Sequence, residues 1–308
     1  MHPSSRCYRR CCSILLAISL MAATAAAQTG PRKPNVPPGK DPGGIAVAVI
    51  GAGVDYRLPE IASRLARDGE GEIIAWDVID DDARPLEAAP VAGRSVPVHA
   101  GTGMALRLLA EAREVRLIPV RIPEANPLAL SGALAFVAQT PARITVLLTR
   151  GDKNPQAQSW QLFTDTARHA RHVLLIATAG HSGQDARDTP LAPSGIPLDN
   201  MLVVTAATPD GQVADGASWG AEHVNLAVTL QAASLPALDV ADRAAALENA
   251  AALQLAALVS RVAALHPDLN GPALKAMVLR QARPLAGISE KRTRDGWIDP
   301  GQPDLRSR

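Results

Sequence analysis

Short apolar runs alternate with segments of helical apolar spacing from residue 45 to residue 282. Short runs bounded by turn residues are typical of buried strands, and a period of three to four residues is typical of helices. We expect strands at 45–50, 73–78, 115–121, 144–149, 173–178, 202–205 and 224–227. We expect helices near 59–67, 101–112, 128–139, 157–171, 241–265 and 271–282. This alternation predicts an α/β fold, a mostly parallel sheet with helices on both faces.

The first segment, residues 1–27, has a basic start, an apolar run and a small-residue end at Ala25-Ala26-Ala27. This pattern is typical of a secretory signal peptide. We therefore expect an exported protein, periplasmic or secreted, without a membrane anchor after leader cleavage. All three cysteines lie within this leader, so the mature chain is expected to have neither a disulfide nor a thiol nucleophile.

The net charge of the chain adds little to these expectations. The chain has 31 basic and 30 acidic side chains, and removal of three leader arginines leaves 28 against 30, a net charge of −2. Such a balance gives no indication of a nucleic-acid partner. Residues 28–44 are rich in Pro and Gly and are expected to be an extended lead-in too short to fold as a propeptide. Residues 45–308 are expected to form one domain.

The order of motifs resembles that of the subtilisin-like serine proteases. The matching segments include VAVIGAGVDY (47–56), DDDARP (80–85), AGTGMALRLLAEA (100–112), VLLIATAGH (173–181), LVSRVAALHPDLNGPALKAMVLRQA (258–282) and GWIDP (296–300). The resemblance implies a three-layer α/β fold and, for intact members, serine-type endopeptidase activity.

The resemblance also implies where the catalytic groups would stand. The aspartate position is Gly51, the histidine position is Ala100, the serine position is Asn249 and the oxyanion-hole asparagine position is His181. The triad needs a carboxylate, an imidazole and a hydroxyl in contact. We therefore expect a pseudoprotease with no catalytic residues.

Neighbouring residues offer only weak replacements. His99 adjoins the histidine position, but a shift of one residue at a helix start rotates a side chain by about 100°. Asp55 follows the first strand and is expected to serve a surface or turn role. Between Ser234 and Ser260 the chain has no Ser, Thr or Cys. Strong helix formers fill this interval, which predicts an unbroken helix that places Asn249 half-buried inside it.

The resemblance leaves three roles open. Extended peptides pair with the S-x-G segment of the family's cleft, matched here by Thr149, Arg150 and Gly151, so a peptide or protein partner is one hypothesis. A regulatory or structural subunit is a second. A divergent serine endopeptidase with a displaced catalytic site is the third.

No metal or other cofactor is expected. Asp165, His169 and His172 have the spacing of one helix face, but a packing helix explains them better than a metal. The run Asp80–Asp82 is expected to form an exposed turn, and a structural calcium at this turn stays an open alternative.

Overall fold

The computed structural model describes residues 33–88, 101–124, 126–149, 154, 157–230, 240–284 and 292–301. The chain divides into two compact units, Met1–Pro34 and Asn35–Arg308, and the second unit holds all the described helices and strands. Among the described residues, no helix has both the length and the apolar character to cross a membrane.

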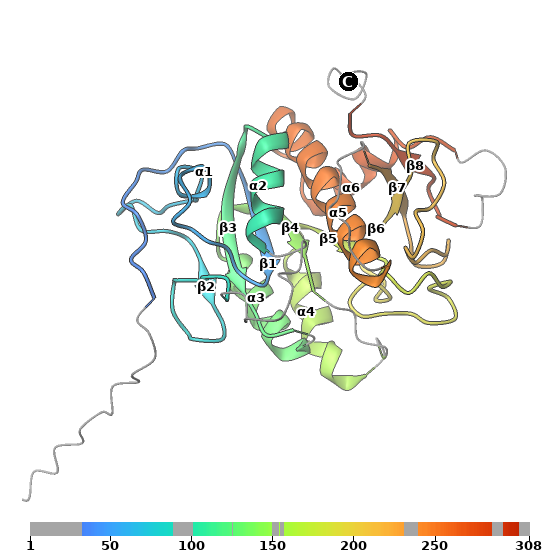
Figure 1. The fold of residues 1–308 in the computed structure, drawn as a ribbon, viewed down its shortest axis with the longest axis horizontal. Coiled ribbons are helices and arrows are strands. Elements are labelled where there is room, and N and C mark those ends of the chain that lie inside the picture. Colours follow the sequence, from blue (N-terminus) through green and yellow to red (C-terminus); the bar gives the residue numbers. More distant parts are fainter. Residues whose placement is uncertain are drawn as a thin grey trace, which may run out of the picture. The chain divides into compact units, whose positions relative to one another are not determined.

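A single sheet of eight strands runs through the second unit, in the order β2-β3-β1-β4-β5-β6-β7-β8 (Figure 1). Every neighbouring pair is parallel. The strands are β1 (Ile45–Gly51), β2 (Trp76–Asp77), β3 (Val115–Arg121), β4 (Ala142–Leu147), β5 (Leu174–Thr178), β6 (Met201–Ala207), β7 (Leu226–Thr229) and β8 (Trp297–Ile298). The predicted α/β class with a mostly parallel sheet is confirmed.

Helices cover both faces of the sheet, giving three layers (Figure 1). They are α1 (Pro59–Ala62), α2 (Gly101–Glu111), α3 (Pro127–Val137), α4 (Gln161–His169, preceded by the 3-10 turn η1, Gln158–Trp160), α5 (Val240–Leu265) and α6 (Gly271–Leu279). Alternate residues of β1 belong to two separate cores. Val47 and Val49 pack in the core formed with α2, α5 and α6, whereas Ala48 packs in the core formed with α3 and α4. This period of two follows from the pleat of a strand.

Two expected elements differ from the structure. The helix expected at 59–67 ends at Ala62 because the chain turns extended: Leu65 forms a parallel bridge with Leu117, and Ala66 N–H donates to Leu117 O. The strand expected at 73–78 is reduced to β2. The short strand β8 was not predicted, since two residues are too few to show a period.

Asparagine side chains cap two of the helices. The Asn270 side chain accepts a hydrogen bond from Ala273 N–H, and Pro272 stands in the first turn of α6. Asn126 caps α3 in the same way through Ala129 N–H. Each cap satisfies an N–H that a helix start leaves without an intrahelical partner.

Residues 35–44 have no regular secondary structure, but Asp41 ties them to the domain. Its carboxylate pairs with Arg116 at 2.6 Å and accepts a hydrogen bond from Arg67 N–H. The Arg67 side chain donates in turn to Pro37 O. These bonds and the Arg116 guanidinium lower the pKa of Asp41 against the opposing effect of burial.

Candidate functional site: the carboxyl edge of the sheet

The carboxyl ends of parallel strands meet at one edge of a sheet, which is where ligand sites of α/β folds form. Gly51 ends β1, Thr149 follows β4 and His181 follows β5. Three of the expected positions therefore lie at this edge. His99, Ala100, Arg150 and Gly151 lie outside the described residues.

Gly51 sits in a tight place. A Cβ at this position would lie 3.1 Å from Leu148 O and 3.2 Å from Leu148 Cβ, closer than most side-chain contacts. The end of β1 is therefore packed backbone against backbone, with no room prepared for a carboxylate. In register, Gly51 pairs with Arg121, the last residue of β3.

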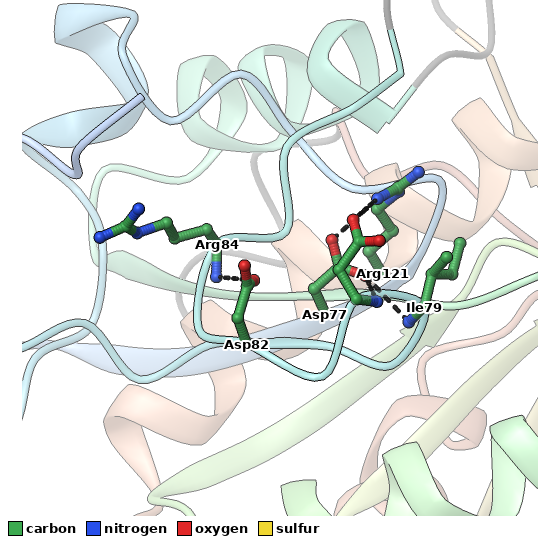
Figure 2. Close-up of polar contacts among 6 residues, drawn as sticks. Asp77, Ile79, Asp82, Arg84 and Arg121 are labelled. Atoms are coloured by element: carbon green, nitrogen blue, oxygen red, sulfur yellow. Dashed lines mark hydrogen bonds and ion pairs between the residues drawn. The ribbon is translucent and has the colours of Figure 1, made fainter. Parts of the chain in front are cut away.

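Arg121 is held by two aspartates (Figure 2). Its Nη1 lies 2.9 Å from Asp77 Oδ2 and 3.0 Å from Asp80 Oδ2. The Asp77 side chain is fully buried and also accepts the N–H groups of Ile79 and Asp80. These carboxylates raise the pKa of Arg121 although its burial acts in the opposite direction. A charge cluster that no sequence pattern predicted thus stands next to the former aspartate position.

The three aspartates of the 80–82 turn have separate partners. Asp80 binds Arg121, and Asp81 accepts the indole N–H of Trp76 at 3.2 Å. Asp82 accepts Arg84 N–H at 2.7 Å (Figure 2). Within the described part of the chain, no three His, Cys, Asp or Glu side chains come together to hold a metal ion. The carboxylates thus order the turn rather than converging on a cation.

The carboxylate of Asp55 is also bound by a neighbouring side chain. Its two carboxylate oxygens accept the Arg57 guanidinium, at 2.8 Å for Nε and 2.7 Å for Nη2. The hydrogen bond from Arg57 lowers the pKa of Asp55. Asp55 N–H donates to Thr102 Oγ1 near the start of α2. The residue therefore fixes a turn, the role expected for it.

The predicted continuous helix through the serine position is confirmed. α5 runs from Val240 to Leu265, and Asn249 lies half-buried about two and a half turns inside it. Ser260, the first hydroxyl of this helix, is fully buried and donates to Ala256 O and Ala257 O. Neither position has the exposed hydroxyl at a helix start that a nucleophilic serine needs.

Glu248 is a buried carboxyl group to which the order of motifs assigned no role of its own. Its side chain lies at the carboxyl ends of the central strands, where Oε1 is 2.9 Å from both Thr205 Oγ1 and Ala206 N. Burial raises the pKa of Glu248 to about 8. In the sequence, Glu248 stands out only as the single acidic residue within the Ala- and Leu-rich run ALENAAALQLAAL.

The loop after β5 holds the oxyanion-equivalent position. Gly180 adopts a φ of +104° and His181 follows it, half-buried. The next residue, Ser182, is exposed and lies 3.0 Å, oxygen to oxygen, from the buried hydroxyl of Ser218, which also accepts Ser182 N–H. Ser218 thus anchors this loop.

Asp165 and His169 lie on α4, but the helix ends at His169. His172 is therefore outside the helix, and the expectation that 157–171 is helical was wrong at this end. His169 Nδ1 contacts Asp165 O, and the Asp165 carboxylate accepts Gln161 Nε2. The helical spacing that suggested a shared face does not hold for His172.

This edge has the location of an α/β active site, and the hydroxyls of Ser182 and Ser218 contact each other there. The fold is that of the subtilisin-like serine proteases. The A-subunit of the AB5 toxin from E. coli superposes with a TM-score of 0.62 at 17% identity, covering 83% of this chain and 90% of that one. A cold adapted subtilisin-like serine proteinase gives 0.59 at 15% identity, covering 88% and 94%.

A third structure, MycP1 with the N-terminal propeptide removed, gives a TM-score of 0.58 at 18% identity over 84% of this chain and 89% of that one. At these identities the likeness is one of fold. No family model and no curated protein matches the sequence. The three-layer subtilisin-like architecture expected from the motifs is therefore confirmed by structure.

Proposed function

We propose that this chain is an exported pseudoprotease of subtilisin-like fold that binds a peptide or protein partner through the former substrate cleft. A leader at residues 1–27 supports export. The partner role follows from a cleft that keeps its framework while its four chemical positions are Gly51, Ala100, His181 and Asn249.

The observation that carries this proposal is the position of Asn249 inside a continuous helix. In the triad mechanism a hydroxyl attacks the carbonyl after an imidazole removes its proton. Loss of the serine or the histidine of subtilisin reduces its rate by roughly a millionfold. Loss of an oxyanion-hole donor costs a further factor of about 10² to 10³ in rate. A chain that lacks every one of these groups has no route to proteolysis at this site.

Backbone pairing does not need a triad. Thr149 is half-buried directly beyond β4, next to the central strand β1. In the proposed binding mode, an extended peptide pairs with the backbone of the segment that begins at Thr149. The guanidinium of Arg150 favours an acidic residue or a carboxyl terminus in the partner.

Fluorophosphonate labelling, read by intact-protein mass spectrometry, tests the loss of catalysis. The reagent reports an activated serine without knowledge of the substrate. We expect no adduct on the purified protein under conditions that label an active subtilisin completely. A stoichiometric adduct on any serine would overturn the proposal.

The binding role needs its own test. Proteins captured from the same extracellular fraction by the wild-type chain are compared with those captured by Arg150→Glu. Arg168→Glu is the matched control, because Arg168 is an exposed arginine of α4 whose ion pair with Asp165 is long, at 3.9 Å. We expect Arg150→Glu to lose a partner that Arg168→Glu retains. Identical capture by all three proteins counts against cleft binding.

A divergent serine endopeptidase is the second candidate function. The observation that favours it is the exposed hydroxyl of Ser182 next to the oxyanion-equivalent His181. An adduct mapped to Ser182, abolished in Ser182→Ala, would select this candidate over the pseudoprotease.

A further inference from the structure

A cavity of about 260 Å³ is lined by neighbours of the contacting serines Ser182 and Ser218, and none of its lining residues is one of the expected catalytic or peptide-pairing positions. It is formed where the loop after β5 meets the 212–219 segment and the segment leading to β8. Its lining includes Gly183, Asp215, Gly216, Ala217, Trp219 and Arg292. A volume of this size is below the roughly 300–1,000 Å³ typical of drug-sized ligands and suits a smaller molecule or one end of a chain.

Arg292 lies on one wall, with its guanidinium 4.2 Å from the centre of the Trp219 ring. The backbone of Arg292 is fixed, because Gly220 N–H donates to Arg292 O at 2.7 Å. A guanidinium stacked on an aromatic face keeps its N–H edge available for hydrogen bonds in the plane of the group. Trp219 therefore orients the guanidinium without using its N–H groups.

Other arginines of the chain use these donors internally. Arg64, Arg143 and Arg294 each donate to backbone carbonyl oxygens. By contrast, the Arg292 guanidinium makes no hydrogen bond or ion pair with any residue that the structure describes. The half-buried guanidinium held over this ring therefore keeps donors that an acceptor in the cavity could reach.

Beside Arg292, the cavity wall includes glycine backbone without side chains. Gly183 and Gly216 face each other, since a Cβ on Gly183 would lie 3.5 Å from Gly216 Cα. Their φ angles are +66° and +78°, in the region that favours glycine. Within the described residues, neither N–H donates to a protein acceptor. Unpaired backbone N–H groups beside a guanidinium are a setting that favours an anion.

Asp215 completes the lining. It forms no ion pair with Arg292 or with any other described residue. The cavity is therefore lined by an arginine and an exposed aspartate that do not pair with each other. Such a pair is suited to a ligand that carries both charges, or to a carboxylate that uses the cation alone.

We propose that this cavity binds a small ligand by its carboxylate group, which the N–H edge of Arg292 receives while Trp219 supports the guanidinium. Two sources have this chemistry. A free amino acid would also place its ammonium group at Asp215, whereas the carboxyl terminus of a peptide would not use Asp215. The proposal does not rest on the cleft-binding role, because it is argued from Arg292, Trp219 and Asp215 and not from the peptide-pairing segment at Thr149.

Calorimetric titration of the purified protein tests the proposal with four probes: alanine, N-acetylalanine, alanine amide and trialanine. We expect binding of at least one carboxylate probe and none of alanine amide. Arg292→Gln is expected to weaken that binding at least tenfold. Arg292→Lys, which keeps the charge but loses the two-pronged geometry, is expected to weaken it less.

The matched control is Arg294→Gln, two residues away, which removes the same charge from a side chain that donates to Ala221 O. This variant is expected to bind like the wild type. Loss of alanine binding in Asp215→Asn, with N-acetylalanine not bound, assigns the site to free amino acids. Equal binding of trialanine and N-acetylalanine, unaffected by Asp215→Asn, assigns it to peptide ends. No binding of any carboxylate probe at millimolar concentration, or equal binding by folded Arg292→Lys, Arg292→Gln and wild type, overturns the proposal.

Discussion

Glu248 Oε1 lies 2.9 Å from Thr205 Oγ1, and the same hydroxyl oxygen lies 2.6 Å from Ser218 O. A hydroxyl has one proton, and a carbonyl oxygen can only accept. The single proton of Thr205 therefore has two candidate acceptors, Glu248 Oε1 and Ser218 O. Burial raises the pKa of Glu248 to about 8, which favours the neutral carboxyl group at pH 7.

A neutral carboxyl group also fits the surroundings. Glu248 is 1% exposed, Oε1 accepts Ala206 N–H, and Oε2 has no hydrogen-bond partner among the described residues. The N–H groups of Ala179 and Gly180 oppose the rise in pKa without reaching hydrogen-bonding geometry with Oε2. A charge here would be uncompensated, and an uncompensated buried charge is strongly unfavourable.

The first prediction concerns the pH dependence of stability. The folded-state pKa of Glu248 is about 8 against an ordinary value of 4.5, so ionisation favours the unfolded chain. The contribution of the protonated group is complete below pH 4.5 and is lost as the pH rises to about 8. At about 1.4 kcal/mol per pH unit, the loss is on the order of 5 kcal/mol.

Urea unfolding of the wild type and Glu248→Gln between about pH 5 and 8.5 measures this effect. The amide cannot ionise, so the variant is expected to lack this slope. It carries instead a pH-independent cost of about 1–3 kcal/mol, because its amide brings N–H donors to the buried place where Oε2 has no hydrogen-bond partner among the described residues. Parallel stability curves for the two proteins would show that Glu248 is already ionised in the folded state.

A second prediction compares two helix glycines. Gly101 begins α2, and a Cβ there would overlap the backbone oxygen of Gly53. Ala is favoured over Gly in a helix by about 1 kcal/mol, but this contact requires the backbone to move. Gly101→Ala is therefore expected to lower the free energy of unfolding by about 2 kcal/mol or more.

Gly132 of α3 is the matched control. A Cβ there meets only the Trp76 ring, at 3.7 Å or more, an ordinary contact. Gly132→Ala is expected to raise the free energy of unfolding by up to about 1 kcal/mol. Chemical denaturation measures the free energy of unfolding of both variants. Equal changes would mean that helix propensity alone determines the effect of the two substitutions.

Much of the fold was predictable because its signals are local. Residues 45–50 and 115–121 are apolar runs largely buried between two helix layers, and such strands stand out in a sequence. β2 and β8 are two residues each, and residues 65–66 pair with β3 through backbone bonds that leave no period. These edge elements depend on tertiary contact, which is why pattern alone missed or mislocated them.

For the candidate site, the sequence predicted only which residues stand at the family's catalytic positions. The order of motifs located Gly51, His181 and Asn249, and the helix formers around Asn249 predicted its helical setting. The Arg121–Asp77 pair and the stacking of Arg292 on Trp219 join residues 44 and 73 positions apart in the sequence. No spacing rule connects such residues, so only the three-dimensional structure reveals them.

A third prediction concerns the buried ion pair. The Asp77 side chain is fully buried and binds Arg121, Ile79 N–H and Asp80 N–H. Breaking a buried pair typically costs about 3–5 kcal/mol, and here the loss of Asp77 also leaves two N–H groups without their acceptor and Arg121 with Asp80 alone. Asp77→Ala is expected to destabilise the protein by about that amount in urea unfolding.

The Asp80→Ala variant tests whether burial sets the strength of an ion pair with Arg121. Asp80 binds the same Nη1 of Arg121 at nearly the same distance, but its side chain is 47% exposed. Exposed pairs contribute at most about 1 kcal/mol, so this variant is expected to lose no more than that. A similar loss for both variants would show that burial does not set the strength of these contacts.

The last prediction concerns the serine position itself. Asn249→Ser restores the hydroxyl that the family's motif would place there, within a helix whose next hydroxyl, Ser260, is buried. A hydroxyl inside a helix, without an imidazole to remove its proton, stays a weak nucleophile. We therefore expect no fluorophosphonate adduct and a change in unfolding free energy below about 1 kcal/mol, since Asn and Ser have similar helix propensities.

Adding a histidine should not change the outcome. Ala100→His combined with Asn249→Ser supplies both reacting groups, but α5 still begins at Val240 and keeps the hydroxyl away from a helix start. An active subtilisin in the same reaction controls for the reagent. Stoichiometric labelling at position 249 in either variant would show that α5 opens around Asn249, and only then would two substitutions separate this chain from a working nucleophile.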